Sequence, residues 1–372
     1  MKILVTGGAG FIGSHTVDRL LQMGHSVRIL DNLQKPVHLK GRPAYLQPDA
    51  EFIEGDVRDR ETLRCAMDGV DVIFHLAAYQ DYGTDFSTFF HTNAVSTALL
   101  YEIIVQEKMD VRKVIVASSQ FVQGEGLYRN RSGQTVAPVL RTQEQLAGGL
   151  WDFVDSDGAP LEKLWTPEAH AAPTNAYAMS KYSQEMQAIR FGRRYDIPSV
   201  ALRYSIVQGA RQSFYNAYSG ACRIFSLHYF FGKAPTIYED GSQTRDFVNI
   251  HDVVDANILV MERDDADYEV FNVGGGVSHT VVDFGAVVAR VFGHEDLPPK
   301  IPGLYRFGDT RHANSDISKL RALGWEPRRT IHDSVHEYAD YLRAQTDIED
   351  ILDYAEKAMA MQDIVRRVRG AS

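Results

Sequence analysis

A tyrosine and a lysine that could together transfer protons, Tyr177 and Lys181, stand four residues apart. In a helix this spacing places both side chains on one face. A neighbouring ammonium group favours a phenolate, so we expect Lys181 to lower the pKa of Tyr177 from about 10 towards neutrality. A phenol with such a pKa can act as a general acid and a general base. The spacing alone is common, and by itself it more often reflects packing than catalysis.

A glycine-rich segment, Thr6-Gly7-Gly8-Ala9-Gly10-Phe11-Ile12-Gly13, follows a short apolar run and opens a helical pattern. In this context the glycines are typical of dinucleotide binding, because Gly7 permits a tight turn and Gly10 lets the backbone approach a pyrophosphate. Gly13 lets the helix lie close to the sheet, so that the helix N-terminus faces the anion. The motif predicts cofactor contacts from Gly7, Gly10, Phe11, Ile12 and Gly13.

An acidic residue, Asp31, ends the second apolar run 18 residues after Gly13. A carboxylate at this position accepts hydrogen bonds from the adenosine ribose and repels a 2′-phosphate, which favours tightly bound NAD over NADP. Asn32 could share the ribose contact. Residues after the third and fourth apolar runs are also expected to line the cofactor: Asp56, Val57, Leu76, Ala77 and Ala78.

The scaffold for these residues is predicted by short apolar runs that alternate with helical periodicity, the pattern of βαβ units. We therefore expect an α/β protein with a Rossmann-type doubly wound parallel sheet. Its first helix should bury Val17, Leu20 and Leu21 and end at Gly24 with a left-handed cap. The six strand candidates are Ile3-Leu4-Val5, Val27-Arg28-Ile29-Leu30, Phe52-Ile53, Val72-Ile73-Phe74, Val114-Ile115-Val116 and Ser199-Val200-Ala201-Leu202.

The alternation becomes irregular from about Gln208, which indicates a smaller mixed α/β lobe for substrate binding in the C-terminal part. We assign residues 1–204 and roughly 246–272 to an NAD-binding domain, and residues 205–245 and 273–345 to the substrate lobe. Residues 346–372 are expected to form a helical tail, since apolar residues recur there at roughly helical spacing. These residues are Ile351, Leu352, Ala355, Met359 and Ile364.

One long connection, residues 124–173, is polar and weakly periodic and contains several Gly and Pro residues. Long connections without regular structure are more often functional lids than accidents. We therefore expect this segment to cover or border the site.

Composition excludes several classes of function. The formal net charge of −10 disfavours nucleic acid as a partner. The two cysteines, Cys65 and Cys222, do not make a disulfide framework and are expected to be free thiols in a reducing cytoplasm. No apolar run reaches the ~18 residues that span a bilayer, and no secretory signal is visible at Met1. The 13 histidines include no metal-binding motif, so we expect no metal.

Taken together, the glycine motif, Asp31, His75-Leu76-Ala77-Ala78, the Ser118-Ser119 pair and Tyr177 with Lys181 resemble an extended short-chain dehydrogenase/reductase. Later segments are similar to landmarks of nucleotide-sugar epimerases and dehydratases, in the same order: Arg245-Asp246-Phe247-Val248, Phe271-Asn272-Val273-Gly274-Gly275 and Arg306-Phe307-Gly308-Asp309. The resemblance covers nearly the whole chain.

The resemblance implies roles for individual residues. Tyr177 would be the acid and base, Lys181 would hold the nicotinamide ribose, and Ser119 would hydrogen-bond the reacting hydroxyl. Arg245 and Arg306 would grip the substrate diphosphate, a task suited to forked and permanently charged donors. Asn93, Ser118 and Tyr204 would lie at the cofactor, and Gln120 at the substrate.

The resemblance also narrows the reaction. Dehydratases and decarboxylases of this family carry acidic residues just after the position of Ser119, whereas this chain has Gln120 and Phe121. Neither side chain can transfer a proton, so a 4-epimerase that needs only a hydride shuttle is favoured. In that reaction Tyr177 takes the C4 hydroxyl proton while C4 gives its hydride to NAD⁺, and the 4-keto sugar then turns over and receives the hydride on its other face. The long segment after Ser119, with Leu150-Trp151-Asp152-Phe153, and the stretch Gly308-Asp309-Thr310-Arg311-His312 look most like dTDP-L-rhamnose 4-epimerases.

Some positions depart from the family pattern, and alternatives stay open. Ile206 stands where the family usually has a phosphate-binding Asn, and Gln123 stands where it usually has Tyr. A nucleotide-sugar dehydrogenase, reductase or dehydratase is the second enzymatic reading, and an NAD-binding redox sensor is the non-enzymatic one. The resemblance implies a homodimer formed through helices around residues 97–105 and 177–194. The sugar and the nucleotide base, dTDP or UDP, are not determined by the motifs.

Overall fold

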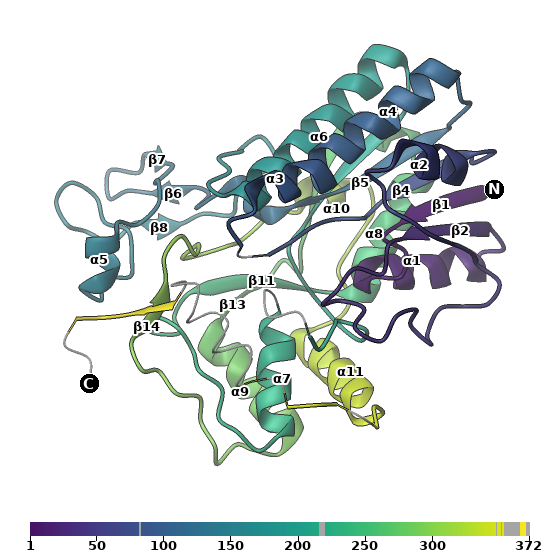
Figure 1. Cartoon of the computed structure of the whole chain (residues 1–372). Coiled ribbons are helices and arrows are strands. Elements are labelled where there is room, and N and C mark those ends of the chain that lie inside the picture. Colours follow the sequence, from purple (N-terminus) through teal and green to yellow (C-terminus); the bar gives the residue numbers. More distant parts are fainter. Residues whose placement is uncertain (82, 216–219, 347, 351, 353–364, 370–372) are drawn as a thin grey trace.

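The computed structural model describes residues 1–81, 83–215, 220–346, 348–350, 352 and 365–369. Its main element is a seven-stranded parallel sheet with the order β12-β9-β5-β4-β1-β2-β3 (Figure 1). The strands are β1 (Lys2–Thr6), β2 (Ser26–Asp31), β3 (Glu51–Glu54), β4 (Val72–His75), β5 (Lys113–Ser119), β9 (Ser199–Tyr204) and β12 (Glu269–Val273). The six predicted strands and the doubly wound fold are confirmed, and β12 is an additional edge strand.

Helices cover both faces of this sheet because alternate strand residues point to opposite sides. Ile3 and Val5 pack towards α1 and α8, whereas Leu4 packs towards α2, α4 and α6. Figure 1 shows α4 and α6 side by side above the sheet, with α1 and α8 on the other face. The bounds are α1 (Phe11–Gln22), α2 (Arg60–Met67), α3 (Phe86–Phe89), η1 (Phe90–Val95), α4 (Ser96–Glu107), α6 (Ala176–Tyr195), α8 (Ile250–Glu262) and η3 (Asp264–Ala266).

The first helix has the predicted form. Val17 and Leu20 are fully buried, and Leu21 packs at the edge of the same core. Gly24 follows the helix with φ +80, and its N–H donates to the Leu21 carbonyl at 2.9 Å. The left-handed cap turns the chain directly into β2.

A smaller lobe lies beyond the carboxyl ends of the strands. It contains the three-stranded sheet β10-β11-β13, in which β10 and β11 are parallel and β13 is antiparallel. A separate core of aromatic and aliphatic residues, including Phe247, Phe284 and Val335, joins this sheet to its helices. The bounds are β10 (Ile206–Gln208), α7 (Ala221–Phe230), β11 (Thr244–Asn249), β13 (Ser278–Thr280), α9 (Val281–Phe292) and α11 (Ile331–Arg343). The short helix α10 (Ser318–Ala322) instead packs on β12 and the core of the large sheet.

The long connection 124–173 has regular structure, contrary to its weak periodicity. After the short helix η2 (Gln120–Gln123), the chain forms an antiparallel sheet of the order β7-β6-β8 and one short helix. Their bounds are β6 (Tyr128–Arg129), β7 (Thr135–Val136), α5 (Gln143–Ala147) and β8 (Glu162–Lys163). We call residues 124–173 the insertion.

The end of the chain differs from the predicted helical tail. Val365–Arg367 form β15, which pairs antiparallel with β14 (Leu304–Arg306). The prediction is wrong there because this short basic segment is extended by pairing with another strand. Val368 then packs against the buried cluster of Leu146, Ala147 and Tyr305, and the Arg369 N–H donates to the Ala147 carbonyl at 2.9 Å. Four of the residues that suggested a helix lie outside the described residues: Ile351, Ala355, Met359 and Ile364.

Candidate active site

A cavity of about 1410 Å³ extends from the glycine-rich turn after β1 to the smaller lobe. It lies outside the carboxyl ends of the strands, where ligands bind in doubly wound sheets. Every residue predicted for the site lines this cavity except Asn93 and Gln120. The residues brought together are Gly7, Gly10, Phe11, Ile12, Gly13, Asp31, Asn32, Asp56, Val57, Leu76, Ala77, Ala78, Ser118, Ser119, Tyr177, Lys181, Tyr204, Arg245 and Arg306.

The glycine-rich turn is a cradle that side chains would fill. Gly7 has φ +69, and a Cβ there would lie 2.7 Å from the Ala77 nitrogen. A Cβ on Gly13 would lie 2.1 Å from the Gly7 carbonyl oxygen. Helix α1 begins directly after Gly10, so its unpaired N–H groups face the cavity. This geometry fits the pyrophosphate of a dinucleotide.

Asp31 both shapes the cradle and faces the cavity. Its two carboxylate oxygens accept the N–H of Ala9 at 3.0 Å and of Leu33 at 2.9 Å. A carboxylate has about four acceptor positions, so capacity remains for ribose hydroxyls. The loop after β2 covers this end, because the Tyr45 hydroxyl donates to the Ala9 carbonyl at 2.8 Å and His38 lies 4.0 Å from Asp31. The sequence offered no motif for this loop, although its length between two strands was a signal.

Asn32 and Asp56 lie together beside this end of the cavity. The Asn32 amide donates to Asp56 at 3.0 Å, and the Arg58 guanidinium donates to both oxygens of the same carboxylate. These hydrogen bonds, with that of Arg58 the largest cause, lower the pKa of Asp56 to about 2. Asp56 is therefore a carboxylate at neutral pH.

The catalytic candidates Ser119, Tyr177 and Lys181 all line the cavity. Asn175 caps α6 by accepting the Ala178 N–H at 2.8 Å, which fixes the first turn that carries Tyr177. Burial raises the pKa of Tyr177 to about 12, although a hydrogen bond with Ser119 opposes this shift. Burial also lowers the pKa of Lys181 to about 7, and its ammonium group donates to Gln184 at 2.8 Å. The expected lowering of the Tyr177 pKa is thus wrong, because burial dominates.

Asn93 and Gln120 are buried beside the cavity instead of lining it. The Asn93 amide accepts the Tyr79 N–H at 2.8 Å and donates to the Tyr79 carbonyl and the Ser180 hydroxyl. Asn93 therefore ties the loop after β4 to helix α6. The Gln120 amide has no hydrogen-bond partner among the described residues. Direct ligand contacts by these two residues stay predictions.

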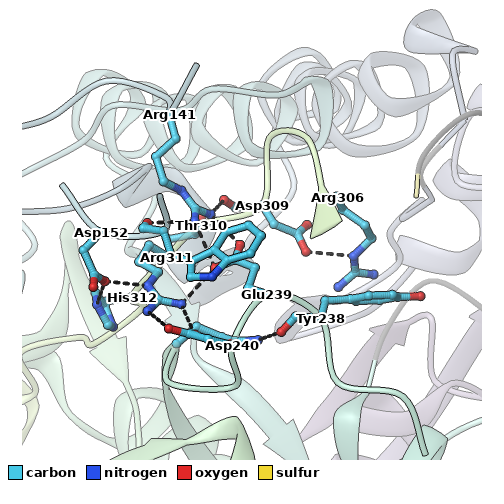
Figure 2. Close-up of polar contacts among 12 residues, drawn as sticks. Arg141, Asp152, Tyr238, Glu239, Asp240, Arg306, Asp309, Thr310, Arg311 and His312 are labelled. Atoms are coloured by element: carbon cyan, nitrogen blue, oxygen red, sulfur yellow. Dashed lines mark hydrogen bonds and ion pairs between the residues drawn. The ribbon is translucent and has the colours of Figure 1, made fainter. Parts of the chain in front are cut away.

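Two arginines form the cationic end of the cavity. Arg245 on β11 is half-buried, and its described hydrogen-bond acceptors are the carbonyl oxygens of Thr244, Thr310 and Arg311, at 2.8 to 2.9 Å. A guanidinium has five N–H donors, so these bonds leave capacity for an anion. Arg306 on β14 donates to Asp309 at 2.8 Å and lies over the Tyr238 ring, as Figure 2 shows. Two half-buried cations at one end of a cavity fit a diphosphate.

The two departures from the family pattern have different surroundings. Ile206 lines the cavity, so no amide is available there to bind a phosphate. Gln123 is buried and donates to the Thr166 carbonyl and to Asn272. Its role is to bind the insertion to β12.

A cluster of charged residues behind the two arginines was not predicted from the sequence. The Arg311 cluster comprises Arg141, Asp152, Glu239, Asp240 and Arg311 (Figure 2). The similarity to dTDP-L-rhamnose 4-epimerases around Asp152, and the family segment that begins at Arg306, had indicated that this region belongs to the site. The pairing itself has no local signal, because its members come from three distant parts of the chain.

No helix in the described part of the chain is both long and apolar enough to cross a membrane. Among the same residues, no group of three or more His, Cys, Asp or Glu side chains could hold a metal ion. Cys65 and Cys222 are both free thiols, as predicted.

The fold and the site define a dinucleotide-binding enzyme in which a buried tyrosine, serine and lysine line the same cavity as the glycine-rich cofactor turn. The family described as the NAD dependent epimerase/dehydratase family matches residues 3–146 and 153–274. The chain belongs to this family. The predicted family, fold class and NAD cofactor are thereby confirmed.

Relatives and solved structures agree on one kind of enzyme. The chain is 32% identical over 353 residues to dTDP-L-rhamnose 4-epimerase of Burkholderia thailandensis, covering 93% of this chain and 96% of the relative. It is 31% identical over 348 residues to UDP-glucose 4-epimerase of Mycolicibacterium smegmatis, covering 92% and 99%. UDP-glucose 4-epimerase of Thermotoga maritima, solved with UDP-glucose, superposes with a TM-score of 0.75 at 32% identity and covers 92% and 99%. That of Thermus thermophilus, solved with NAD, has a TM-score of 0.71 at 26% identity and covers 93% and 100%.

Proposed function

We propose that the protein epimerises a nucleotide-activated hexose at C4 through a transient 4-keto sugar. The observation that carries this proposal is the cavity, which is lined by Tyr177 together with the dinucleotide cradle and with Arg245 and Arg306. A nucleotide sugar held by its diphosphate at the arginines would reach Tyr177 with its hexose. The 4-epimerase relatives support the same conclusion.

The proposed chemistry uses one proton and one hydride. Bound NAD supplies a hydride acceptor that returns the hydride to the opposite face of the sugar. Tyr177 accepts the C4 hydroxyl proton as the C4–H bond breaks and C4 becomes a carbonyl, and it returns the proton when the C4–H bond re-forms. Ser119, hydrogen-bonded to Tyr177, orients the hydroxyl. The positive charges of oxidised nicotinamide and Lys181 would favour the phenolate that burial disfavours.

The proposed substrate is a dTDP-6-deoxyhexose, supported by the Burkholderia thailandensis relative. A UDP-hexose is the second candidate, supported by the Thermotoga maritima enzyme solved with UDP-glucose. The stretch around Asp152, which is similar to dTDP-L-rhamnose 4-epimerases, contacts Arg311 behind the cationic end of the cavity and favours the first candidate.

The test starts from purified protein. Denaturation should release NAD, and the native protein should invert C4 of one member of a panel of UDP-, dTDP-, GDP- and CDP-hexoses, followed by NMR without added cofactor. Stoichiometric formation or consumption of NADH would contradict the proposal and indicate a dehydrogenase or reductase. Bound NAD without turnover of any sugar nucleotide would favour the redox sensor.

We further propose a homodimer that acts in the cytoplasm. Met179 and Met186, seven residues apart on α6, are each 44% exposed, and Val95 on the neighbouring η1 is 48% exposed. An apolar surface on adjoining helices is typical of an interface. The exposed free thiol of Cys65 fits a reducing compartment. Light scattering should give twice the chain mass, and Met186→Lys should shift it towards the monomer.

A further inference from the structure

The insertion contacts residues 309–311, at the cationic end of the cavity, through the side chains of Glu125, Arg141 and Asp152. Arg141 donates to Glu239 at 2.8 and 2.9 Å and to the Asp309 carbonyl at 2.7 Å. Asp152 accepts from the Arg311 Nε at 2.8 Å. Residues 309–311 are therefore held by the insertion from one side.

The carboxylates of the Arg311 cluster outnumber its guanidinium groups. Its two guanidinium groups meet three carboxylates, and Arg311 alone contacts Asp152, Glu239 and Asp240. The side chains of Arg141 and Arg311 are each only 1% exposed. The cluster is therefore a structural support and not itself the anion site.

Residues 309–311 in turn hold both arginines that line the cavity. The carbonyls of Thr310 and Arg311 accept from Arg245, and the Asp309 carboxylate accepts from Arg306. The Arg311 N–H is fixed by Glu125 of the insertion at 3.0 Å. A displacement of this stretch would move Arg245 and Arg306 together.

The backbone conformation of Glu239, a member of the Arg311 cluster, is also held by its surroundings. Glu239 has φ +56, and its N–H donates to the carbonyl of Leu304, the first residue of β14, at 2.6 Å. Its carboxylate joins Arg141 to Arg311. Unfavourable backbone conformations persist where the surroundings hold them, often at ligand sites.

We propose that the insertion positions the diphosphate-binding arginines, with Arg141 and Asp152 as the positioning residues. The inference rests on the proposed function, since it concerns the site of the nucleoside diphosphate. It assigns to the insertion a role in substrate affinity and not in the chemical step.

Two variants test the proposal and leave the other charged side chains of the Arg311 cluster in place. Arg141→Lys keeps the positive charge beside Glu239 but loses the planar fork that reaches three acceptors at once. Asp152→Ala removes an acceptor whose side chain is 55% exposed, so folding is preserved. The matched control is Glu162→Ala, which breaks the exposed Arg129–Glu162 pair on the same insertion.

The probes are UDP and dTDP, measured by calorimetry on the NAD-loaded protein, together with KM and kcat for the nucleotide sugar that the protein converts. We expect both variants to weaken binding of the preferred diphosphate and to raise KM by about tenfold, with kcat within about twofold. Asp152→Asn, which keeps an acceptor oxygen, should recover most of the loss. Glu162→Ala should leave all values unchanged.

The outcomes separate this inference from the proposed function. Unchanged affinity and KM in Asp152→Ala would overturn the inference, as would a loss of kcat alone. Equal losses in Glu162→Ala would indicate general loosening of the insertion and would also overturn it. Failure of the unmodified protein to bind either diphosphate would instead overturn the proposed function. If Arg141→Lys does not fold, Asp152→Ala decides.

Discussion

Arg203 on β9 and Glu185 on α6 form a buried bidentate ion pair with distances of 2.7 and 2.8 Å. The same carboxylate accepts the Ser118 hydroxyl at 2.8 Å. Glu185 lies one helical turn after Lys181, so this pair fixes the catalytic face of α6 against the sheet. The ion pair therefore fixes helix α6 against the sheet next to the catalytic residues.

Removing one partner of this pair should destabilise the protein strongly. Arg203→Met leaves the Glu185 carboxylate buried without a counter-charge, which we expect to lower the free energy of unfolding by about 3–5 kcal/mol. Urea unfolding followed by circular dichroism measures the change. Arg193, also on α6, forms an exposed ion pair with Glu269 of β12. Arg193→Met breaks this pair and should cost less than about 1 kcal/mol. Similar losses in both variants would contradict the role of burial.

Replacing the proposed acid and base should remove turnover and spare the cofactor. Tyr177→Phe lacks the hydroxyl that transfers the proton, so we expect kcat to fall by about 10²–10⁴-fold with NAD still bound. Turnover by NMR and the NAD released on denaturation measure the two effects. Tyr182→Phe, on the same helix, is the matched control. A near-normal rate in Tyr177→Phe would rule out the role of this phenol.

A methyl group on Gly13 should close the cofactor cradle. Its Cβ would meet the Gly7 carbonyl at 2.1 Å, so Gly13→Ala should abolish bound NAD and destabilise the protein by about 1–3 kcal/mol. Gly148→Ala is the control, because the nearest atom to its Cβ would be 3.4 Å away. The ratio of NAD to protein after purification gives the result. Normal NAD content in Gly13→Ala would mean that the cofactor does not use this turn.

Lys181 should give the cofactor-free protein a pH-dependent stability. Its pKa is lowered to about 7 by burial, whereas in the unfolded chain it is about 10.4. Between these values the unfolded chain binds more protons, so stability should rise with pH. We expect Lys181→Met to remove up to about 2 kcal/mol of the rise between pH 7 and 9. Parallel pH profiles of the two proteins, from urea unfolding without NAD, would contradict this assignment.

The sequence allowed prediction of the parts whose signals are local. The turn at Gly7 to Gly13 joins β1 to α1, Tyr177 and Lys181 lie one turn apart on α6, and these residues line one cavity. The edge strand β12 was not predicted as a strand because the polar residues Glu269 and Asn272 interrupt its short apolar pattern.

Long-range pairing could not be predicted. Arg141 and Glu239 are 98 residues apart, and no periodicity encodes their contact. The strand Val365–Arg367 is defined by its partner β14 and not by its own residues, two of which are arginines. The pKa of Tyr177 was predicted in the wrong direction because sequence spacing shows a neighbouring charge but not the depth of burial.

The pairing of β15 with β14 can form only late in the synthesis of the chain. The glycine cradle, Tyr177 and Lys181 all precede residue 205, whereas the strand that pairs with the Arg306 segment is completed only at Arg367. Domains generally fold as the chain emerges, with N-terminal parts first. A nascent chain can thus acquire most of its dinucleotide cradle long before β15 can pair with the segment that carries Arg306.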